Sequence, residues 1–516
     1  MTEAIIKPVT MEILTPNKIF SNTTKKKIKP HTHGNFNDKE FITEKKIKMK
    51  TNALSLISIA ALLLFTGCTS DETTDRITKP KNPDTDGLTA FVVEDNKPQT
   101  RTTGEYDGSG INFYWTADDH LWVNNGTLRK DVKNNIADLL VPNPNIPTGV
   151  KRAATAKFYF DGTYAANSYY VHYTGLLGTG DKVNFSAVQN QPIPNDASHL
   201  HASGDCGTGL AQRVEGRYHF TLNHKASYLT FIPYSTQESV REGVLTAIQI
   251  TADQAIAGQF NFNDNGVVLS SRPVANSSTM SIYLKLNNFE IPTSPDPTKN
   301  ASIIVLPPGN YSRIDVEYHI HSNATNMTGI IFKRYTGVNL AAGKNKKVSA
   351  DLQVKNYGAY NTNTFREWSS PANGCPNVNE CYWYFLQGYP TWDSKTLWEA
   401  NGHLYTGGMW FLKRSQISGF NASHYGGVDR TALNNPQYEI APYSTNGHPN
   451  LALTNRFFFM PALGYGYVGG GIGGAGRYWT STNRGGNTAY VWAFSATSVG
   501  VGNNIYQMLM PWWIVQ

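Results

Sequence analysis

Apolar and polar residues alternate along several stretches between residues 88 and 354. From Ile314 to His321, the even positions up to Ile320 are apolar, and the odd positions hold charged or polar residues. Ile282, Leu284 and Leu286 repeat the same spacing. Because successive side chains on a strand point to opposite faces, these patterns predict half-buried strands of antiparallel sheets.

Turn signals separate the predicted strands. Asn265-Gly266 lies between two apolar pairs and predicts a tight hairpin. No long helical periodicity occurs between residues 88 and 354. Repeated short strands joined by Gly, Pro and Asn turns favour β-sandwiches.

An apolar run of a different kind precedes this region. Lysines around Met49 lead into an uncharged apolar stretch from Ala53 to Phe65, followed by Thr66, Gly67 and Cys68. A basic head, an apolar core and a small-residue cleavage site predict a signal peptide over residues 49–67. The core is shorter than the ~20 apolar residues of a membrane-spanning helix.

The end of this run, Phe65-Thr66-Gly67-Cys68, resembles a bacterial lipobox. The resemblance implies cleavage between Gly67 and Cys68 and acylation of the Cys68 thiol, for example by palmitate. The alternative is a plain secretory signal with an incidental cysteine.

The segments on either side of the signal peptide are not expected to fold. Residues 1–48 read as a disordered basic leader or as a start assigned too far upstream. Residues 68–87 are a polar tether, in which Ser70-Asp71-Glu72 resembles the acidic export signal of bacteroidetes-type surface lipoproteins. The expected location is the outer membrane, lipid-anchored and facing outward.

Composition and charge narrow the classes of function. Residues 1–50 hold 11 lysines and 5 acidic residues, so of the formal net charge of +7 only about +1 remains from Cys68 onward. The basic total is therefore no argument for a nucleic-acid partner. Low overall charge (16%) with 45 glycines and 28 tyrosines is typical of β-rich extracellular proteins.

Short motifs occur in order across residues 88–354. They are Thr100-Arg101-Thr102, Phe113-Tyr114-Trp115, Asp118-Asp119, Leu121-Trp122-Val123, His224-Lys225-Ala226-Ser227, Pro308-Gly309-Asn310-Tyr311 and Gly343-Lys344. Together they resemble the fimbrillins, the lipoprotein pilins of bacteroidetes-type surface fibres. The resemblance implies two tandem transthyretin-like β-sandwich domains, over residues 88–250 and 251–354.

The resemblance also implies a maturation step and a partner. In fimbrillins a trypsin-like protease cuts after a basic residue and removes the first strand, which opens a groove. Arg76 and Arg101 are the candidate positions here, and Arg101 lies in the Thr-Arg-Thr motif. Another fimbrial subunit would then bind by β-strand addition.

The composition changes after a polar linker at residues 355–368. Nine of the eleven tryptophans lie from Trp368 onward. The segments Met460 to Tyr465, Arg477 to Thr482 and Ala489 to Phe494 resemble a C-type-lectin-like fold, in particular the bacterial major paralogous domain. The expected fold is mainly β: two sandwiches followed by an α+β lectin-like domain over residues 369–516.

Aromatic and amide side chains of this last domain are candidates for ligand binding. Aromatic faces stack on sugar rings, and amides bond hydroxyl groups. The candidates are Trp479, Asn483, Arg484, Asn487 and Trp492. Tyr490, Trp492 and Phe494 alternate, however, which is also the pattern of a core strand. The triplets of calcium-dependent lectins are absent, so no metal or cofactor is expected.

Three cysteines follow Cys68. Cys375 and Cys381 are expected to form a disulfide in an oxidising exterior, with two thiols or a metal site as alternatives. His199 and His201 near Cys206 allow a cysteine nucleophile with a histidine base, but a polar loop is the preferred interpretation.

These patterns favour a fimbrial tip or accessory subunit with an adhesive lectin-like head. The alternatives are a stand-alone surface glycan-binding lipoprotein and an enzyme of the formylglycine-generating type; enzymatic activity is not expected. The apolar stretch Met508 to Gln516 reads as a core strand. Without a free donor strand, the subunit would accept a neighbour but not extend the fibre.

Overall fold

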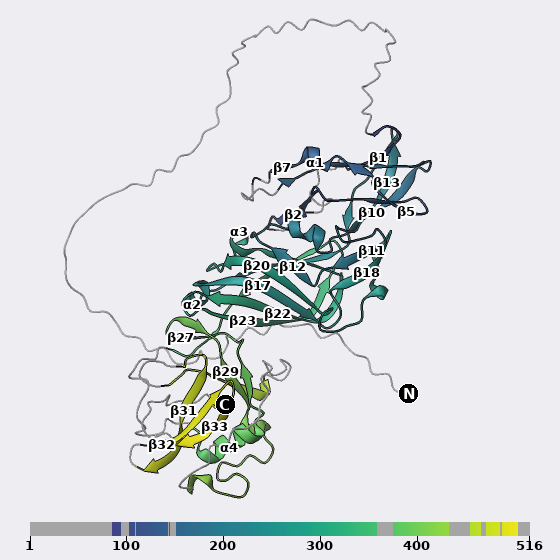
Figure 1. Ribbon diagram of the computed structural model, residues 1–516. Coiled ribbons are helices and arrows are strands. Elements are labelled where there is room, and N and C mark those ends of the chain that lie inside the picture. The colour runs from purple at the N-terminus through teal and green to yellow at the C-terminus, as the bar shows by residue number, and fades with distance from the viewer. Residues whose placement is uncertain are drawn as a thin grey trace, which may run out of the picture. The chain divides into compact units, whose positions relative to one another are not determined.

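The computed structural model describes nine ranges of the chain (Figure 1). They are residues 85–93, 103–108, 110–142, 144, 151–358, 375–432, 455–465, 471–485 and 488–503. All of them belong to one compact unit, Thr78–Gln516. Its described part is mainly β, which confirms the predicted class.

The N-terminal part is built on a nine-stranded sheet. The strand order is β5-β4-β10-β13-β14-β1-β9-β6, and β15 pairs with β13. The bounds are β1 (Thr89–Val93), β4 (Trp122–Asn124), β5 (Leu128–Lys130), β6 (Lys133–Asn134), β9 (Ala156–Phe160), β10 (Ser168–Tyr173), β13 (Gly207–Val214), β14 (Arg217–His219) and β15 (Asn223–His224). Beside it lie α1 (Ile136–Leu139), the pair β2 (Thr103–Tyr106) and β3 (Ile111–Tyr114), and the pair β7 (Val141–Pro142) and β8 (Lys151–Arg152).

Two further sheets pack over one core to form what we call the second sandwich. One has the order β12-β20-β17-β22-β23 and the other β21-β16-β24. The bounds are β12 (Val188–Gln191), β16 (Ser227–Tyr234), β17 (Gly243–Ala252), β20 (Ser281–Glu290), β21 (Ser302–Leu306), β22 (Gly309–Ser322), β23 (Met327–Leu340) and β24 (Asn345–Asp351). Leu229 and Ile304 meet Ile248, Leu284 and Tyr318 in this core.

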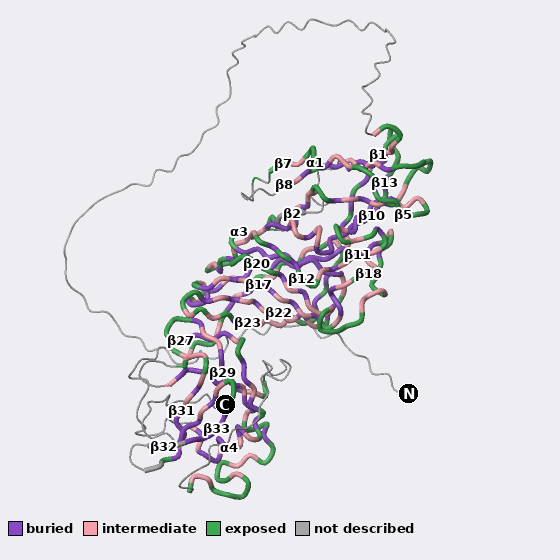
Figure 2. The backbone as a smooth tube through the Cα atoms, viewed as in Figure 1, coloured by how far each residue is buried: buried purple, intermediate pink, exposed green. Residues whose placement is uncertain are grey.

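Strands β16 and β21 are buried on both faces. Figure 2 shows buried positions gathered in the interior between the labelled strands β17, β20 and β12. Their other face packs on a layer made of β2–β3, β11 (Lys182–Phe185), β18 (Gly258–Asn263), β19 (Gly266–Val267) and η3 (Ser198–Ala202). Tyr228 and Ile303 contact Phe113, Phe185 and Phe260 there. Burial on both faces explains why these two strands are apolar at nearly every position rather than at alternate ones.

The alternation read from the sequence is confirmed. Ile314, Val316, Tyr318 and Ile320 are all buried in β22. The hairpin signal at Asn265-Gly266 joins β18 to β19. In residues 88–354, the described helices are short: α1, α2 (Glu238–Arg241), α3 (Pro297–Asn300), η3 and η4 (Leu269–Ser271).

The expected boundary near residue 250 needs correction. Residue 250 lies inside β17, which is the middle strand of the five-stranded sheet. Strands β11, β12 and β16, all before residue 250, also pair within the second half. Turn residues also occur between paired strands of one sheet, as at Asn265-Gly266, so turn signals do not separate a domain boundary from an ordinary turn.

The C-terminal region, by which we mean the described residues from 375 onward, combines one helix with short sheets. Its bounds are α4 (Val378–Gln387), β26 (Thr391–Asp393), β27 (Trp398–Ala400), β28 (His403–Tyr405), β29 (Gly408–Leu412), η5 (Arg414–Gln416), η6 (Arg430–Ala432), β30 (Phe457–Pro461), β31 (Ala475–Gly485), β32 (Thr488–Ser495) and β33 (Val499–Asn503). Asn377 caps α4, with Glu380 completing a capping box. Strands β31, β32 and β33 form one antiparallel sheet.

The C-terminal region is joined to the second sandwich by more than the chain itself. Strand β25 (Lys355–Asn356), at the start of the expected linker, pairs in parallel with β27. Leu397 and Leu404 belong to the core of the second sandwich. The buried Glu399 carboxylate accepts hydrogen bonds from Ser239 Oγ (2.7 Å), Asn356 Nδ2 (2.8 Å) and Gln237 Nε2. The expected linker therefore begins as a strand.

Candidate functional site

Strand β1 lies inside its sheet rather than at an edge. It pairs in parallel with β14, where Phe91 lies opposite Tyr218, and antiparallel with β9 from Thr89 to Val93. Phe91, Val92 and Val93 are at most 1% exposed. The strand nearest the N-terminus among the described residues therefore holds two parts of the sheet together.

The Phe91 side chain makes most of the aromatic contacts of β1. Its ring stacks on Tyr218 with centroids 4.6 Å apart, and it meets Phe160 edge to face at 5.0 Å. Such pairs stabilise by about 0.5–1.5 kcal/mol beyond the area that they bury. Phe91 is thus the principal anchor of the strand.

The predicted processing residues lie outside the described residues. This holds for Gly67, Cys68, Arg76 and Arg101. In the sequence, Arg101 falls in the interval between the end of β1 at Val93 and the start of β2 at Thr103. A cut after Arg101 would break the covalent connection between β1 and every later strand.

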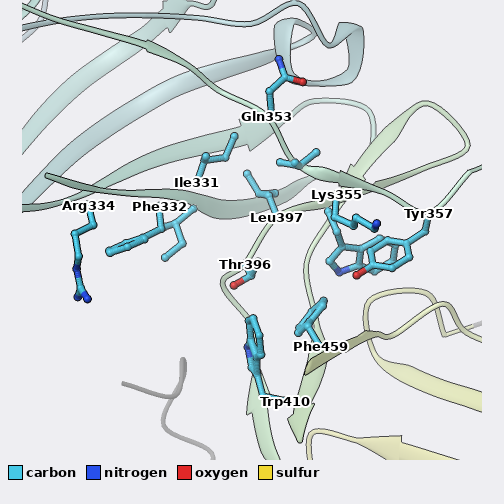
Figure 3. A pocket seen from close by; sticks show the side chains of 13 residues that line it. Ile331, Phe332, Arg334, Gln353, Lys355, Tyr357, Thr396, Leu397, Trp410 and Phe459 are labelled. Carbon is cyan, nitrogen blue, oxygen red and sulfur yellow. The ribbon is translucent and has the colours of Figure 1, made fainter. Parts of the chain in front are cut away.

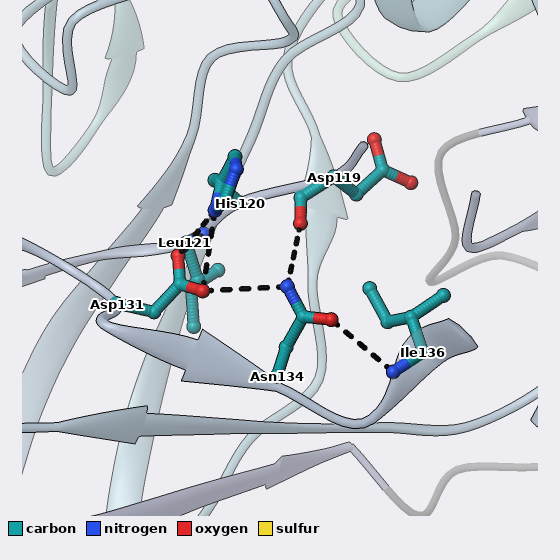
Figure 4. A network of polar contacts seen from close by, with 6 residues as sticks. All are labelled: Asp119, His120, Leu121, Asp131, Asn134 and Ile136. Atoms are coloured by element: carbon teal, nitrogen blue, oxygen red, sulfur yellow. Dashed lines mark hydrogen bonds and ion pairs between the residues drawn. The ribbon is translucent and has the colours of Figure 1, made fainter. Parts of the chain in front are cut away.

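The acidic motif Asp118-Asp119 lies beside a buried polar network centred on Asp131 (Figure 4). The buried Asp131 carboxylate accepts hydrogen bonds from the Leu121 amide (2.8 Å) and from Nδ1 of His120 (3.1 Å). Asn134 Nδ2 bonds the Asp119 carbonyl at 3.1 Å. Burial raises the pKa of Asp131, although the Leu121 amide and His120 act against it. The network fixes the loop that leads into β4.

The loop with His199, His201 and Cys206 is not built as a nucleophile site. Cys206 is fully buried, and its burial, with Asp205 beside it, raises the pKa of the thiol well above its usual range. Asp205 instead accepts hydrogen bonds from His224 Nδ1 (2.9 Å) and the Tyr228 hydroxyl. A thiol that stays protonated is a poor nucleophile, so this geometry supports the polar-loop interpretation.

His199 is expected to make the stability of the protein sensitive to acid. Its Nε2 bonds the Ile303 carbonyl at 2.9 Å, and burial lowers the pKa of His199 to about 4. The unfolded chain protonates this histidine near pH 6.5, so the stability due to neutral His199 is complete above that pH and is lost toward pH 4. We expect a loss of about 2 kcal/mol, discounted because His199 as a residue is only half-buried.

Thermal unfolding at pH 7 and pH 4.5 measures this effect. His199→Gln keeps a donor for the Ile303 carbonyl but cannot titrate, so it should lose less stability on acidification than the native chain. His201→Gln, in the same turn, is the matched control and should behave like the native chain. Equal acid sensitivity of all three proteins would contradict the assignment.

Two of the five ligand-binding candidates of the C-terminal region, Trp479 and Trp492, are buried in different clusters. Trp492 is fully buried and packs on Phe411, with ring centroids 5.1 Å apart. Trp479 is 4% exposed and belongs to a small cluster with Val491 on the other face of the sheet. The ligand-stacking prediction is therefore wrong for these two tryptophans, because a buried ring offers no face to a sugar.

The polar candidates are less fully described. Asn483 is exposed and pairs with Ala489 near the end of β31. Arg484 lies in β31 as well. Asn487 lies outside the described residues. Alternation of Tyr490, Trp492 and Phe494, already visible in the sequence, was the signal for a core strand, and all three are buried.

Cys375 and Cys381 are not bonded to each other in the structure. Cys381 is buried in the first turns of α4, and its burial raises the pKa of the thiol, to which Glu380 and then Cys375 contribute. Cys375 is half-buried and packs on the same core. The predicted disulfide stays a prediction.

No described helix is long and apolar enough to cross a membrane. No group of three or more His, Cys, Asp or Glu side chains in the described ranges is arranged to hold a metal ion.

The chain is similar to solved structures from Bacteroides. A protein from B. fragilis provisionally described as a cell adhesion protein aligns at 13% identity over 52% of this chain and 94% of its own, with a TM-score of 0.29. A counterpart from B. uniformis aligns at 14% identity over the same shares, with a TM-score of 0.28. A fimbrial protein from B. ovatus aligns at 11% identity over 81% of this chain and 96% of its own, with a TM-score of 0.21.

No family model matches the chain, and no curated protein matches it in sequence. All three TM-scores are below 0.5, so the alignments report the kind of protein that resembles this one and carry no argument. The functional argument rests on the chain's own residues.

Proposed function

We propose that the protein is a fimbrial adhesin: a lipid-anchored surface subunit at the tip or an accessory position of a fibre. It would comprise two transthyretin-like sandwiches and a lectin-like head. The observation that carries the proposal is the position of β1, an interior strand that precedes a candidate cleavage residue.

A cut after Arg101 would leave β1 held only by hydrogen bonds and packing. Once β1 leaves, β9 and β14 each have an unpaired edge, and Tyr218 and Phe160 lose their partner. An extended strand from a neighbouring subunit can pair with both edges and bury an apolar side chain where Phe91 was. This supports the proposed partner, another fimbrial subunit.

The path of the chain after the second sandwich supports a terminal or accessory role. Strand β24 pairs with β16 over seven residues, and the chain then continues into β25, which pairs with β27. A strand tied at both ends cannot leave its own sandwich to fill a neighbour's groove. The subunit would therefore accept a strand without donating β24.

The proposal does not include catalysis. Cys206 and Cys381 are buried, with the pKa of each thiol raised well above its usual range. A reactive cysteine needs the opposite environment, partly exposed and electropositive. The environments of these two thiols are thus unlike that of a catalytic cysteine.

Expression of three variants beside the native chain tests this function. Cys68→Ala should take up no labelled fatty acid and should leave the membrane fraction. Arg101→Ala should retain β1 and should be missing from fibres, whereas Arg76→Ala, the matched control, should assemble normally. An antibody to residues 369–516 should place gold at fibre ends.

Some outcomes would count against the proposal. Gold along the whole shaft would contradict the tip or accessory position. Fibre-associated protein that still begins at Cys68 would contradict cleavage after Arg101. Fatty acid on the Cys68→Ala variant would contradict the lipid anchor.

A further inference from the structure

A cavity of about 500 Å³ lies where β23 of the second sandwich meets the C-terminal region (Figure 3). Phe332 and Arg334 of β23 line one side, and Lys355 and Tyr357 lie across from them. Trp410 and Phe459 line the part of the cavity that the C-terminal region forms. A cavity of this volume is in the range that proteins use for small ligands.

Two aromatic rings in this cavity are accessible and fixed in place. Trp410 of β29 pairs with Phe459 of β30, with ring centroids 5.0 Å apart. Both are half-buried, in contrast to the buried Trp479 and Trp492. Trp410 Nε1 donates to Oδ2 of the buried Asp393 at 2.8 Å, which holds the indole in its orientation. Preset apolar faces suit the C–H side of a sugar ring.

The charged side chains that line the cavity are both cationic. Arg334 is held by a bidentate pair with Asp315, at 2.6 and 2.9 Å. Lys355 is exposed on β25. The described lining contains no Asp or Glu. Asp315 balances the charge of Arg334, but three of the five guanidinium N–H donors stay outside this pair.

We propose that this cavity binds one acidic sugar of a glycan, a uronic or sialic acid unit. The sugar ring would lie on Trp410 and Phe459, and its carboxylate would face Lys355. The inference deepens the adhesive role proposed above and rests on it, since it names the class of ligand. Charge complementarity distinguishes this ligand from a neutral sugar, which could use only the aromatic faces.

Titration of the purified full chain with methyl glycosides tests the inference. Glucuronic acid and N-acetylneuraminic acid glycosides should change the tryptophan fluorescence saturably, and the glucose glycoside should bind at least about fivefold more weakly. Higher salt should weaken only the acidic ligands. Lys355→Ala should weaken acidic ligands about three- to tenfold and leave the glucose affinity unchanged.

Lys346→Ala is the matched control because Lys346 is exposed on β24 and does not line the cavity. It should bind like the native chain. Trp410→Phe should weaken both acidic and neutral ligands, because it removes ring area and the bond to Asp393. Lack of saturable binding of the acidic glycosides, or equal losses from Lys355→Ala and Lys346→Ala, would overturn the inference.

The glycoside titration and the fibre experiments test the cavity inference and the fimbrial role separately. If acidic glycosides fail to bind while the native chain still appears at fibre ends, the cavity inference falls and the fimbrial role stands. If they bind but the chain never enters fibres, the fimbrial role falls and the acidic-sugar site stands.

Discussion

A chain that begins at Thr102 and so lacks β1 is expected to have its first sheet divided into two parts. Strands β9 and β6 would no longer be joined to β14, because β1 lies between β9 and β14 and pairs with both. The amides of β9 and β14 should then lose protection against hydrogen exchange. Three buried side chains leave with the strand, which amounts to roughly 5–9 kcal/mol at 1.5–3 kcal/mol each. This is comparable with the whole stability of a domain.

A synthetic peptide of residues 87–96 should restore that protection when it is added to the shortened chain. The same peptide with Phe91→Ala is the control, and it should bind at least a hundredfold more weakly, since Phe→Ala in a core costs about 3–5 kcal/mol. Unchanged exchange in β9 after deletion, or equal binding of both peptides, would contradict the groove that the proposed function requires.

Trp492→Ala is expected to destabilise the sheet of β31, β32 and β33 by about 3–5 kcal/mol. The indole contacts the rings of Tyr384, Phe385 and Phe411 inside the core of the C-terminal region. Removing it leaves a cavity that rigid aromatic neighbours fill poorly. Native-state hydrogen exchange of the β32 amides measures this local stability, and it avoids treating the whole chain as one two-state system.

Trp383→Ala is the matched control for this prediction. Trp383 lies on α4, is half-buried and contacts Phe420 and Tyr425. Its loss should cost less than about 2 kcal/mol. If Trp492→Ala left the exchange of β32 unchanged and removed ligand binding instead, the core assignment would be wrong.

Strands with one buried face were readable from the sequence. Ile314 to Ile320 and Ile282 to Leu286 follow period two, and their apolar positions are buried as expected. Strand β16 could not be predicted from alternation, because both of its faces are covered and its buried positions do not follow a period of two. Helix α4 left a usable signal, the Asn377 and Glu380 capping box.

The sequence predicted only part of the β1 site and none of the cavity. The prediction of Arg101 as a candidate cleavage residue followed from the family resemblance. The interior position of β1, in contrast, depends on pairing with residues 156–160 and 217–219. The cavity combines side chains from β23, β25, β29 and β30. No local pattern marks residues as neighbours when they come from strands so far apart in the chain.

If the C-terminal region is pulled, the hydrogen bonds of Glu399 would transmit the force to the second sandwich through two segments of the chain. Gln237 and Ser239 follow the end of β16, and Lys355 follows the end of β24. The segment after β16 contacts the C-terminal region through hydrogen bonds to Glu399, and the segment after β24 does so through the pairing of β25 with β27. The two segments also contact each other, since Val354 N donates to Gln237 Oε1 at 3.0 Å. Because β16 and β24 run in parallel, tension on the C-terminal region would pull both strands the same way. Their seven-residue ladder would then carry little shear, and β24 would resist being peeled away.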